Sequence, residues 1–302
     1  MKKFLLNIIL FFAIFFVLSI IFDICITKTL QKVTDYPLAK WNSVINKTQN
    51  AEVLILGNSR ARGYNTDILS EILEKKCFNL GINAAAMIQQ MRFYDIYTSF
   101  QDAPKYIIQN VDFITFKKND EHLYQREMFF PYFANFEVRK KIFKIENYDL
   151  FEKYLPCYRY LGYFWMIRQA FGVDIQKENN IIAARHEIKF NEIPNLTGKI
   201  EFDENAIKTF NLFLKEMKKA GIKIILVHAP LYINTLNHIN SMHILDSLSI
   251  ENDVKFLNYA YDTISYNSNY FSNQTHLNKK GEELFTRKLA HDIDSLGILK
   301  RN

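Results

Sequence analysis

A serine and a histidine near opposite ends of this chain have the side chains that nucleophilic catalysis needs. Ser59 ends the turn Gly57-Asn58-Ser59, which follows an apolar run, and His276 stands in a polar loop directly before a helical pattern. A serine hydroxyl is a poor nucleophile until a base accepts its proton, and histidine is the usual base. Ser59 can equally be a helix cap, because serine and asparagine commonly begin helices. Both roles stay open on this evidence alone.

The pattern between these two residues is that of a parallel sheet covered by helices. Apolar runs predict strands at Val53–Leu56, Cys77–Leu80, Tyr106–Asp112, Lys223–His228 and Val254–Leu257. Helical spacing predicts helices at Asp67–Lys75, Ala84–Phe100, Glu204–Ala220, Thr235–Ile250 and Lys279–Ser295. This alternation predicts a three-layer α/β/α domain with a parallel, flavodoxin-like sheet.

The order of these elements lets the two candidate residues meet. Ser59 follows the first predicted strand, and His276 follows the last one. Functional groups of open parallel sheets gather beyond the carboxyl ends of the strands. We therefore expect Ser59 Oγ and a ring nitrogen of His276 to lie within about 4 Å of each other, with Asn273 in the same loop.

The N-terminus predicts a membrane anchor over residues 1–27. Lys2 and Lys3 precede Phe4–Phe22, which has 19 residues without a charge, close to the roughly 20 that cross a bilayer as a helix. A cleaved signal peptide has a shorter apolar core, of about 7–15 residues, and small residues before its cleavage site. The flank 23–26 is bulky instead. The positive-inside rule then predicts a single-pass protein of the bacterial inner membrane, with its folded part outside the cytoplasm.

The remaining chain divides into a stalk at 28–50 and a folded domain at 51–302, with a helical insertion at about 118–198. The insertion contains aromatic stretches such as "YLPCYRYLGYFWMIRQAF". We expect these side chains to form a core that packs over one edge of the sheet. The alternatives are a lid or groove for an apolar or sugar substrate, or a surface that faces lipid.

Composition and charge narrow the possible partners. The net charge of +6 comes from 38 basic residues scattered among 32 acidic ones, without the arginine-rich arm or zinc-finger spacing of a nucleic-acid-binding protein. No HExxH or HxxxH spacing predicts a metal site, and no cofactor is expected. His228, at a strand end, is expected to be structural. Cys25, Cys77 and Cys157 show no CxxC pair and are expected to be thiols, a Cys77–Cys157 disulfide being the alternative.

Two sequence blocks together resemble a known superfamily. Gly57-Asn58-Ser59 and the block "NQTHLNKKG" at 273–281 resemble the SGNH/GDSL hydrolases, specifically their membrane-anchored extracytoplasmic branch, which includes polysaccharide O-acetylation proteins and the D-alanyl-transfer protein of teichoic acid. The resemblance implies that Ser59 is the nucleophile and that its N–H is an oxyanion donor. It implies that His276 is the base.

The other blocks of the superfamily match less completely. The second block corresponds to "NLGINA", so the resemblance implies an oxyanion donor at Gly81 or Ala84. The nearest counterpart of the third block is Asn119 with Asp120, although a turn between lysines is the simpler interpretation. Arg60 directly follows the candidate nucleophile, where it is either solvated or placed to meet an anionic group of a substrate.

Asn273 stands where the superfamily has the aspartate of its triad. An asparagine can orient the imidazole but brings no negative charge, and loss of the acid from a serine triad can lower turnover about 10⁴-fold. Three outcomes stay open: a slow Ser–His enzyme, a triad completed by another acid such as Asp262, or an inactive relative that binds glycans.

The resemblance as a whole implies a serine-dependent ester hydrolase or acyltransferase that acts on a cell-envelope carbohydrate. Its partners would be a glycan or acylated carbohydrate, and a membrane protein that donates acyl groups. The alternative function is a catalytically impaired module for glycan binding or envelope assembly.

Overall fold

The computed structural model describes residues 1–34, 38–112, 115–118, 126–142, 150–172, 201–232 and 239–299. The chain forms two compact units. One consists of residues 1–48 and 125–187, and the other of residues 49–124 and 188–302. The first unit holds the N-terminal helix and much of the insertion, and the second unit holds the sheet.

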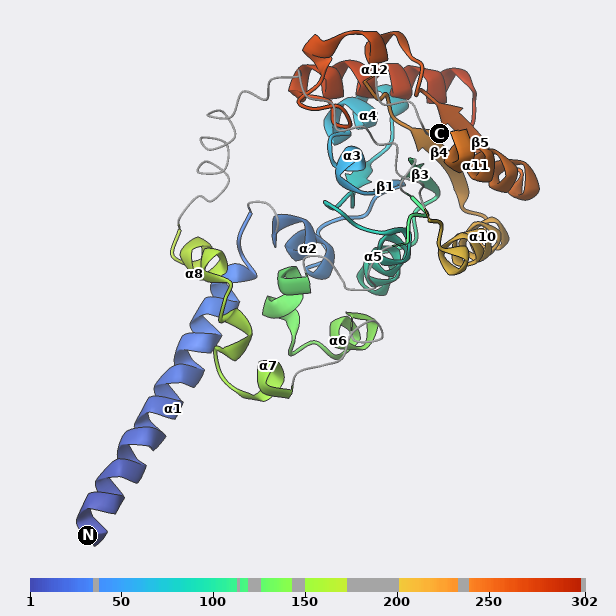
Figure 1. Ribbon diagram of the computed structural model, residues 1–302. Helices are drawn as coiled ribbons and strands as arrows, with labels where there is room; N and C mark the ends of the chain where they lie inside the picture. The colour runs from blue at the N-terminus through green and yellow to red at the C-terminus, as the bar shows by residue number, and fades with distance from the viewer. Residues whose placement is uncertain are drawn as a thin grey trace. The chain divides into compact units, whose positions relative to one another are not determined.

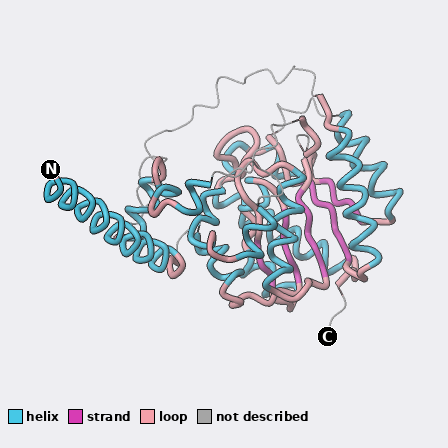
Figure 2. The backbone as a smooth tube through the Cα atoms, turned by 90° about the horizontal axis from the view of Figure 1, so that it is seen from below, coloured by secondary structure: helices cyan, strands magenta, loops and turns pink. Residues whose placement is uncertain are grey.

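The second unit is built on a five-stranded parallel sheet, whose strands lie side by side in Figure 2. The strands are β1 (Val53–Leu56), β2 (Cys77–Asn79), β3 (Tyr106–Asn110), β4 (Lys223–His228) and β5 (Lys255–Asn258). Their order is β2-β1-β3-β4-β5, which is the flavodoxin-like order. Across the central strands, Ile55 pairs with Ile108 and Ile108 pairs with Ile225. The predicted fold class is confirmed, and the carboxyl ends of all five strands open on one edge.

Helices cover both faces of this sheet (Figure 1). They are α3 (Ser59–Arg62), α4 (Thr66–Leu73), α5 (Met87–Phe100), α10 (Glu204–Lys219), α11 (Ile239–Asn252) and α12 (Lys279–Ser295), with two short 3₁₀ turns, η4 (Thr263–Tyr266) and η5 (Ser268–Tyr270). Helices α4 and α12 pack on one face, in a core that includes Ile55 and Ile108 of the sheet and Phe285 of α12. Helices α5 and α10 pack together on the opposite face.

Local sequence signals account for these elements. Ile224–Val227 is a continuous apolar run that is buried on both faces, as parallel strands require. Helix α10 begins where the Asp203 side chain accepts hydrogen bonds from two backbone N–H groups. The chain then leaves the helix at Gly221, whose φ of +75° suits a glycine.

Several predicted boundaries differ from the structure for identifiable reasons. Helix α5 begins at Met87 and not at Ala84, because Ala84 has a φ of +56° that a right-handed helix does not allow. Strand β3 ends at Asn110, because the N–H of Asp112 donates to Thr115 Oγ1 (2.6 Å) and the chain turns. The start of the predicted helix Thr235–Ile250 lies outside the described residues.

The first unit collects the N-terminal helix and short helices of the insertion. These are α1 (Lys2–Leu30), α2 (Leu38–Ile45), η1 (Arg126–Tyr132), α6 (Phe136–Ile142), α7 (Leu150–Tyr154), η2 (Tyr158–Tyr160) and α8 (Phe164–Ala170). Among the described helices, α1 is long and apolar enough to cross a membrane, and none of its most apolar window is buried. This finding supports a single-pass anchor.

Aromatic side chains form the core of the first unit. The ring of Phe130 contacts those of Phe133, Tyr160 and Tyr163 at centroid distances of 5.0–6.3 Å, so part of the insertion forms a core within the first unit. The expected packing of this core over one edge of the sheet stays a prediction. Trp41 in α2 packs on Phe129 at 4.6 Å. The predicted stalk, residues 28–50, therefore contains a helix that belongs to this core.

All three cysteines are free. The alternative prediction of a Cys77–Cys157 disulfide is therefore wrong. Cys77 is buried at the start of β2, where burial raises the pKa of its thiol to about 11. A buried thiol of this kind is inert and serves as a small apolar side chain.

Candidate active site

The turn from β1 into α3 presents Ser59. Gly57 has a φ of +154°, and a Cβ there would lie 2.5 Å from Ala61 Cβ and 2.7 Å from Asn110 Cβ. Only glycine therefore allows this close turn. The N-cap of α3 is Asn58, whose side-chain oxygen accepts a hydrogen bond from the Arg60 N–H (3.0 Å). Because Asn58 caps the helix, the hydroxyl of Ser59 is available to another partner.

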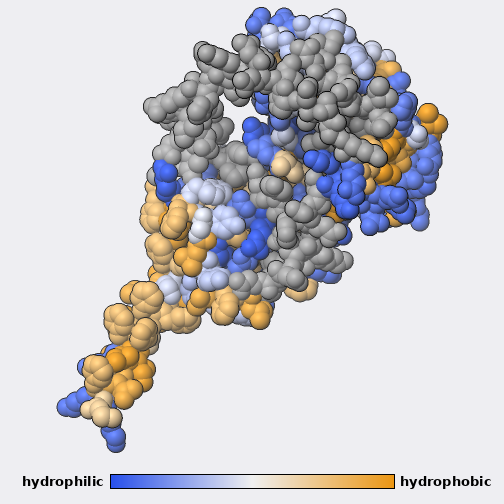
Figure 3. Space-filling view, viewed as in Figure 1, coloured by the Kyte–Doolittle hydropathy of each residue, from blue (hydrophilic) through white to orange (hydrophobic). Residues whose placement is uncertain are grey.

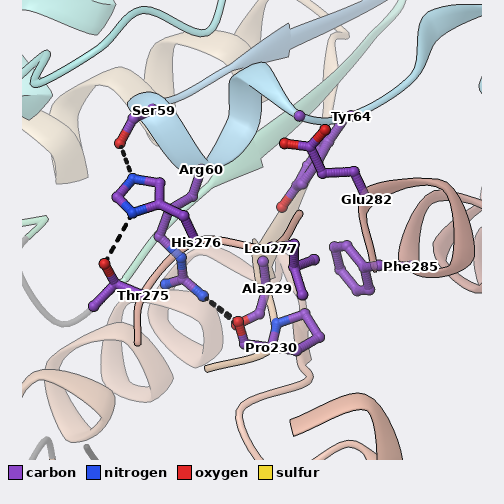
Figure 4. A pocket seen from close by; sticks show the side chains of 11 residues that line it. Ser59, Arg60, Tyr64, Ala229, Pro230, Thr275, His276, Leu277, Glu282 and Phe285 are labelled. Atoms are coloured by element: carbon purple, nitrogen blue, oxygen red, sulfur yellow. Dashed lines mark hydrogen bonds between the residues drawn. The ribbon is translucent and has the colours of Figure 1, made fainter. Parts of the chain in front are cut away.

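That partner is His276. Ser59 Oγ lies 2.7 Å from His276 Nε2, as Figure 4 shows. The histidine stands in a tight loop between η5 and α12, which an antiparallel bridge between Phe271 and Leu277 closes. Asn278 then caps α12 by accepting from the Gly281 N–H (3.0 Å). The expected approach of Ser59 and His276 to within about 4 Å is confirmed.

Asn273 determines which nitrogen of His276 carries the hydrogen. Its Oδ1 accepts hydrogen bonds from the N–H groups of Thr275 (3.0 Å) and His276 (2.9 Å), and it also lies 3.0 Å from His276 Nδ1. Backbone N–H groups can only donate, so the amide oxygen must face the ring. Nδ1 therefore bears the hydrogen, and Nε2 has a lone pair for the Ser59 hydroxyl. Thr275 Oγ1 lies 3.0 Å from the same Nδ1.

Burial and nearby charges keep His276 neutral. Desolvation lowers the pKa of His276 below its usual value, and the positive charges of Arg60 and Arg62 lower it further, while Asp112 opposes them. A neutral imidazole is the form that can accept a proton. The site therefore has its base in the working state at neutral pH.

Arg60 has internal contacts. Its Nη2 donates to the carbonyl oxygens of Ala229 and Pro230, and its Nη1 lies 3.8 Å from Asp112 Oδ2. The side chain is 5% exposed. These contacts tie α3 to the chain that follows β4. Arg60 is therefore not solvated, which corrects one of its two predicted alternatives. Because it also lines a small cavity beside Ser59, its contact with an anionic group of a substrate stays a prediction.

Asp112 is a site residue that the sequence analysis missed. Its carboxylate is fully buried and accepts a hydrogen bond from Asn58 Nδ2 (2.7 Å). It thus supports the residue that caps α3, and it balances the charge of Arg60. The signal that would have indicated it is an acidic residue two positions beyond the end of β3, at the edge of the sheet where the carboxyl ends of the strands lie.

The predicted oxyanion donors fit less well. The N–H of Gly81 donates to Asn79 Oδ1 (2.7 Å), and Asn79 Nδ2 in turn donates to the Ala61 carbonyl at the end of α3 (2.8 Å). Gly81 thus helps to hold α3 in place, and its N–H is already engaged. Ala84 is exposed in the turn before α5. Asn119 lies outside the described residues.

Asp262 does not complete a triad. Its Oδ1 accepts from the Ile264 N–H (3.0 Å), and its carboxylate pairs with Lys288 (3.6 Å). Among the described residues, the side-chain contacts of His276 Nδ1 are those with Asn273 and Thr275. The alternative in which Asp262 supplies the acid is therefore wrong.

A small cavity of about 20 Å³ opens beside Ser59 and His276, which is room for about one water molecule. Its lining includes Tyr64, Thr275, Leu277 and Glu282, which the sequence analysis did not identify. Burial raises the pKa of Glu282. In the described part of the chain, no group of three or more histidine, cysteine or acidic side chains could hold a metal ion.

Comparisons with known proteins found similar solved structures but no matching sequence. No family profile matches the chain, and no curated protein sequence matches it. The structure is similar to a candidate acylhydrolase from Bacteroides fragilis (13% identity over 87% of this chain and 98% of that one, TM-score 0.46). It is also similar to a GDSL-like lipase from Bacteroides thetaiotaomicron (10% identity over 86% and 98%, TM-score 0.45).

A third similar structure is a variant of an acetyl-xylooligosaccharide esterase from Geobacillus (11% identity over 80% of this chain and 94% of that one, TM-score 0.40). The three neighbours are thus described as an acylhydrolase, a GDSL-like lipase and an esterase.

Proposed function

We propose that Ser59, His276 and Asn273 form the catalytic centre of a serine-dependent ester hydrolase. The observation that carries this proposal is the 2.7 Å contact between Ser59 Oγ and His276 Nε2, on a ring whose Nδ1 faces the oxygen of Asn273. In this tautomer the serine hydroxyl donates to Nε2, which is the arrangement that general-base catalysis requires.

The reaction follows from this geometry in two halves. Ser59 Oγ attacks the carbonyl carbon of an ester while His276 Nε2 takes the hydroxyl proton. The tetrahedral intermediate then collapses: the bond to the leaving oxygen breaks, and His276 gives its proton to that oxygen. A water, or a sugar hydroxyl in the case of transfer, next attacks the acyl-serine with the help of the same nitrogen, and Ser59 is regenerated.

Asn273 makes this centre weaker than one with a complete triad. Its amide oxygen orients His276, but it brings no negative charge to stabilise the imidazolium that forms in each half-reaction. The lowered pKa of His276 keeps the base neutral, yet it also makes the ring a weaker proton acceptor. We therefore expect slow turnover.

The proposed substrate is a short-chain ester on a cell-envelope carbohydrate. The small cavity beside Ser59 favours a short acyl group. The apolar helix α1, which begins with Lys2 and Lys3, favours a location at the outer side of the bacterial inner membrane, where such carbohydrates lie. A membrane protein that donates acyl groups would be the partner if the reaction is transfer.

Hydrolysis of 4-nitrophenyl acetate by the full chain in detergent tests the proposal. We expect Ser59→Ala to reduce the rate to background, and a fluorophosphonate probe to label the wild type at Ser59. Ser295→Ala, which changes an exposed serine at the end of α12, should retain the rate. If a folded Ser59→Ala protein hydrolyses the ester as fast as the wild type, Ser59 is not the nucleophile, and the alternative of a glycan-binding module gains support.

A further inference from the structure

Large apolar side chains of the first unit are exposed in α7, in α8 and beside these helices. Six of them define what we call the collar surface: Phe151 and Tyr154 in α7, Leu155 and Leu161 between the two helices, Phe164 in α8, and Phe171 directly after α8. Their exposed fractions range from 43% to 68%. Figure 3 shows apolar residues that continue from α1 onto the adjoining part of this unit. Exposed apolar patches of this kind mark surfaces that contact a partner or a membrane.

The segment that bears the collar surface meets α1 at the outer end of its apolar run. The ring of Phe171 lies 6.3 Å from that of Phe22, centroid to centroid. The Cys157 Sγ lies 3.5 Å from the carbonyl oxygen of Ser19, and the Cys157 N–H donates to Asp23 Oδ2 (2.6 Å). Because Phe4–Phe22 is the length that crosses a bilayer core, these contacts place the segment at the membrane boundary.

Polar contacts hold this segment firmly on α1. Arg159 forms an ion pair with Asp23, and its Nη2 donates to Thr27 Oγ1 (2.9 Å). The hydroxyl of Tyr160 lies 2.8 Å from the same Thr27 Oγ1. These contacts therefore fix the position of the segment along the axis of α1.

We propose that the collar surface lies in the interfacial layer of the same bilayer that α1 crosses. The proposal rests on the membrane span of α1, and it is independent of the ester chemistry. The occupant that we infer is lipid, because the surface is continuous with a helix face whose own partner is lipid. Lys153, whose Nζ lies 4.5 Å from the centre of the Tyr154 ring, adds the aromatic and basic pair that is typical of a membrane interface.

In this arrangement the first unit contacts the membrane at two places, through α1 and through the collar surface. A spanning helix alone leaves the attached unit free to tilt. A second apolar contact at the interface fixes the first unit against the bilayer plane. The competing occupants are a second copy of the chain and a different protein, and each would leave a distinct product in the experiment below.

Photo-crosslinking of the full chain in its membrane distinguishes these occupants. The benzophenone amino acid p-benzoylphenylalanine replaces Phe164 or Phe171 in turn. It also replaces Phe11, an exposed residue within the apolar run, as the positive control. The negative control is Thr48, which is exposed in the same unit. It follows Asn46 by two residues, and Asn46 Nδ2 donates to the carbonyl oxygen of Gln31, the residue after the end of α1. Adducts are identified by mass spectrometry.

We expect lipid adducts at Phe11, Phe164 and Phe171, and none at Thr48. A crosslink from Phe164 and Phe171 to another protein or to a second copy would overturn the proposal. Lipid adducts at Phe11 alone would also overturn it, because they would show that α1 crosses the membrane while the collar surface does not contact lipid. The crosslinks do not depend on catalysis, so an inactive enzyme would leave this result unchanged.

Discussion

His276 receives its orientation from an amide and not from a carboxylate. Asn273 Oδ1 is held toward the ring by two backbone N–H groups, and the same position could hold an aspartate with the same contacts. The side chain thus provides the geometric part of the role of an acid. The electrostatic part, which stabilises the imidazolium, is missing.

Restoring the charge should accelerate the reaction. In Asn273→Asp the carboxylate would lie where the amide oxygen lies now, 3.0 Å from Nδ1, and would stabilise the imidazolium. We expect ester turnover to rise by about 10-fold to 10⁴-fold. Asn267→Asp is the matched control, because it adds the same charge at the cap of η5 in the same segment. A rate that falls or stays constant in Asn273→Asp, measured with 4-nitrophenyl acetate, would contradict this account of the site.

The pH dependence of activity should report the lowered pKa of His276. The base works only when it is neutral, so kcat/KM should rise with pH and reach half its maximum below pH 6.5, the ordinary pKa of histidine. Arg62 is exposed, and its charge lowers this pKa. Arg62→Gln should therefore move the midpoint to higher pH.

The control for this shift is Arg92→Gln on α5, which removes a positive charge that pairs with Asp95 (3.2 Å). A pH–rate profile of each variant measures the midpoint. An equal shift in both variants would mean that the effect is one of net charge. An unchanged midpoint in Arg62→Gln would show that the charge of Arg62 does not lower the pKa of His276.

At the scale of elements, the turn between β1 and α3 depends on Asn58. This side chain caps α3 through the Arg60 N–H, and it donates to the buried Asp112. The nucleophile candidate is the next residue, so the cap also sets the position of its hydroxyl. A substitution here should affect both stability and activity.

Comparison of two cap substitutions separates these effects. Asn65 caps α4 by accepting from two N–H groups, and Asn65→Ala should lower the free energy of unfolding by about 0.5–2 kcal/mol with little change in turnover. Asn58→Ala also removes the 2.7 Å hydrogen bond that Asn58 Nδ2 donates to the buried Asp112, so we expect a loss of about 1–3 kcal/mol and a marked fall in turnover. Denaturant melts and ester hydrolysis provide the two readouts. Equal retention of activity in both variants would mean that Asn58 has no positioning role.

At the scale of the whole molecule, helix α1 is both the candidate membrane span and a structural part of the first unit. Ile26 and Leu30, at its outer end, are 2% and 0% exposed in the core of the first unit. Asp23 pairs with Arg159 of the insertion. Cleavage after Phe22 would leave these residues in the chain but would remove the contacts of Ser19 with Cys157 and of Phe22 with Phe171, so the fold favours an uncleaved helix.

The topology of the chain can be measured directly. Because Lys2 and Lys3 precede the span, we expect the residues beyond about 25 to face away from the cytoplasm. Alkaline phosphatase fused after Asn302 should be active, and green fluorescent protein at the same position should be dark. The reverse pattern, or recovery of a soluble protein that lacks residues 1–22, would refute the anchor.

The sequence by itself determined the strands of the sheet and most of the helices that cover it. Strands β1 and β4 and helix α12 were predicted with the bounds that the structure shows, because their signals are local: a continuous apolar run, a capping residue, a periodic apolar face. The resulting parallel topology placed Ser59 and His276 at one edge of the sheet. Their meeting followed from the order of elements alone.

The tertiary structure alone decided the partners of individual side chains. The sequence left open whether Ser59 is a helix cap or a nucleophile, left Asp262 open as the acid, and did not indicate Asp112. The structure resolved each of these, because a hydrogen bond or ion pair depends on distances between groups far apart in the chain. For the same reason it joined the predicted stalk to the aromatic insertion: the Trp41 and Phe129 rings meet only after the chain has folded.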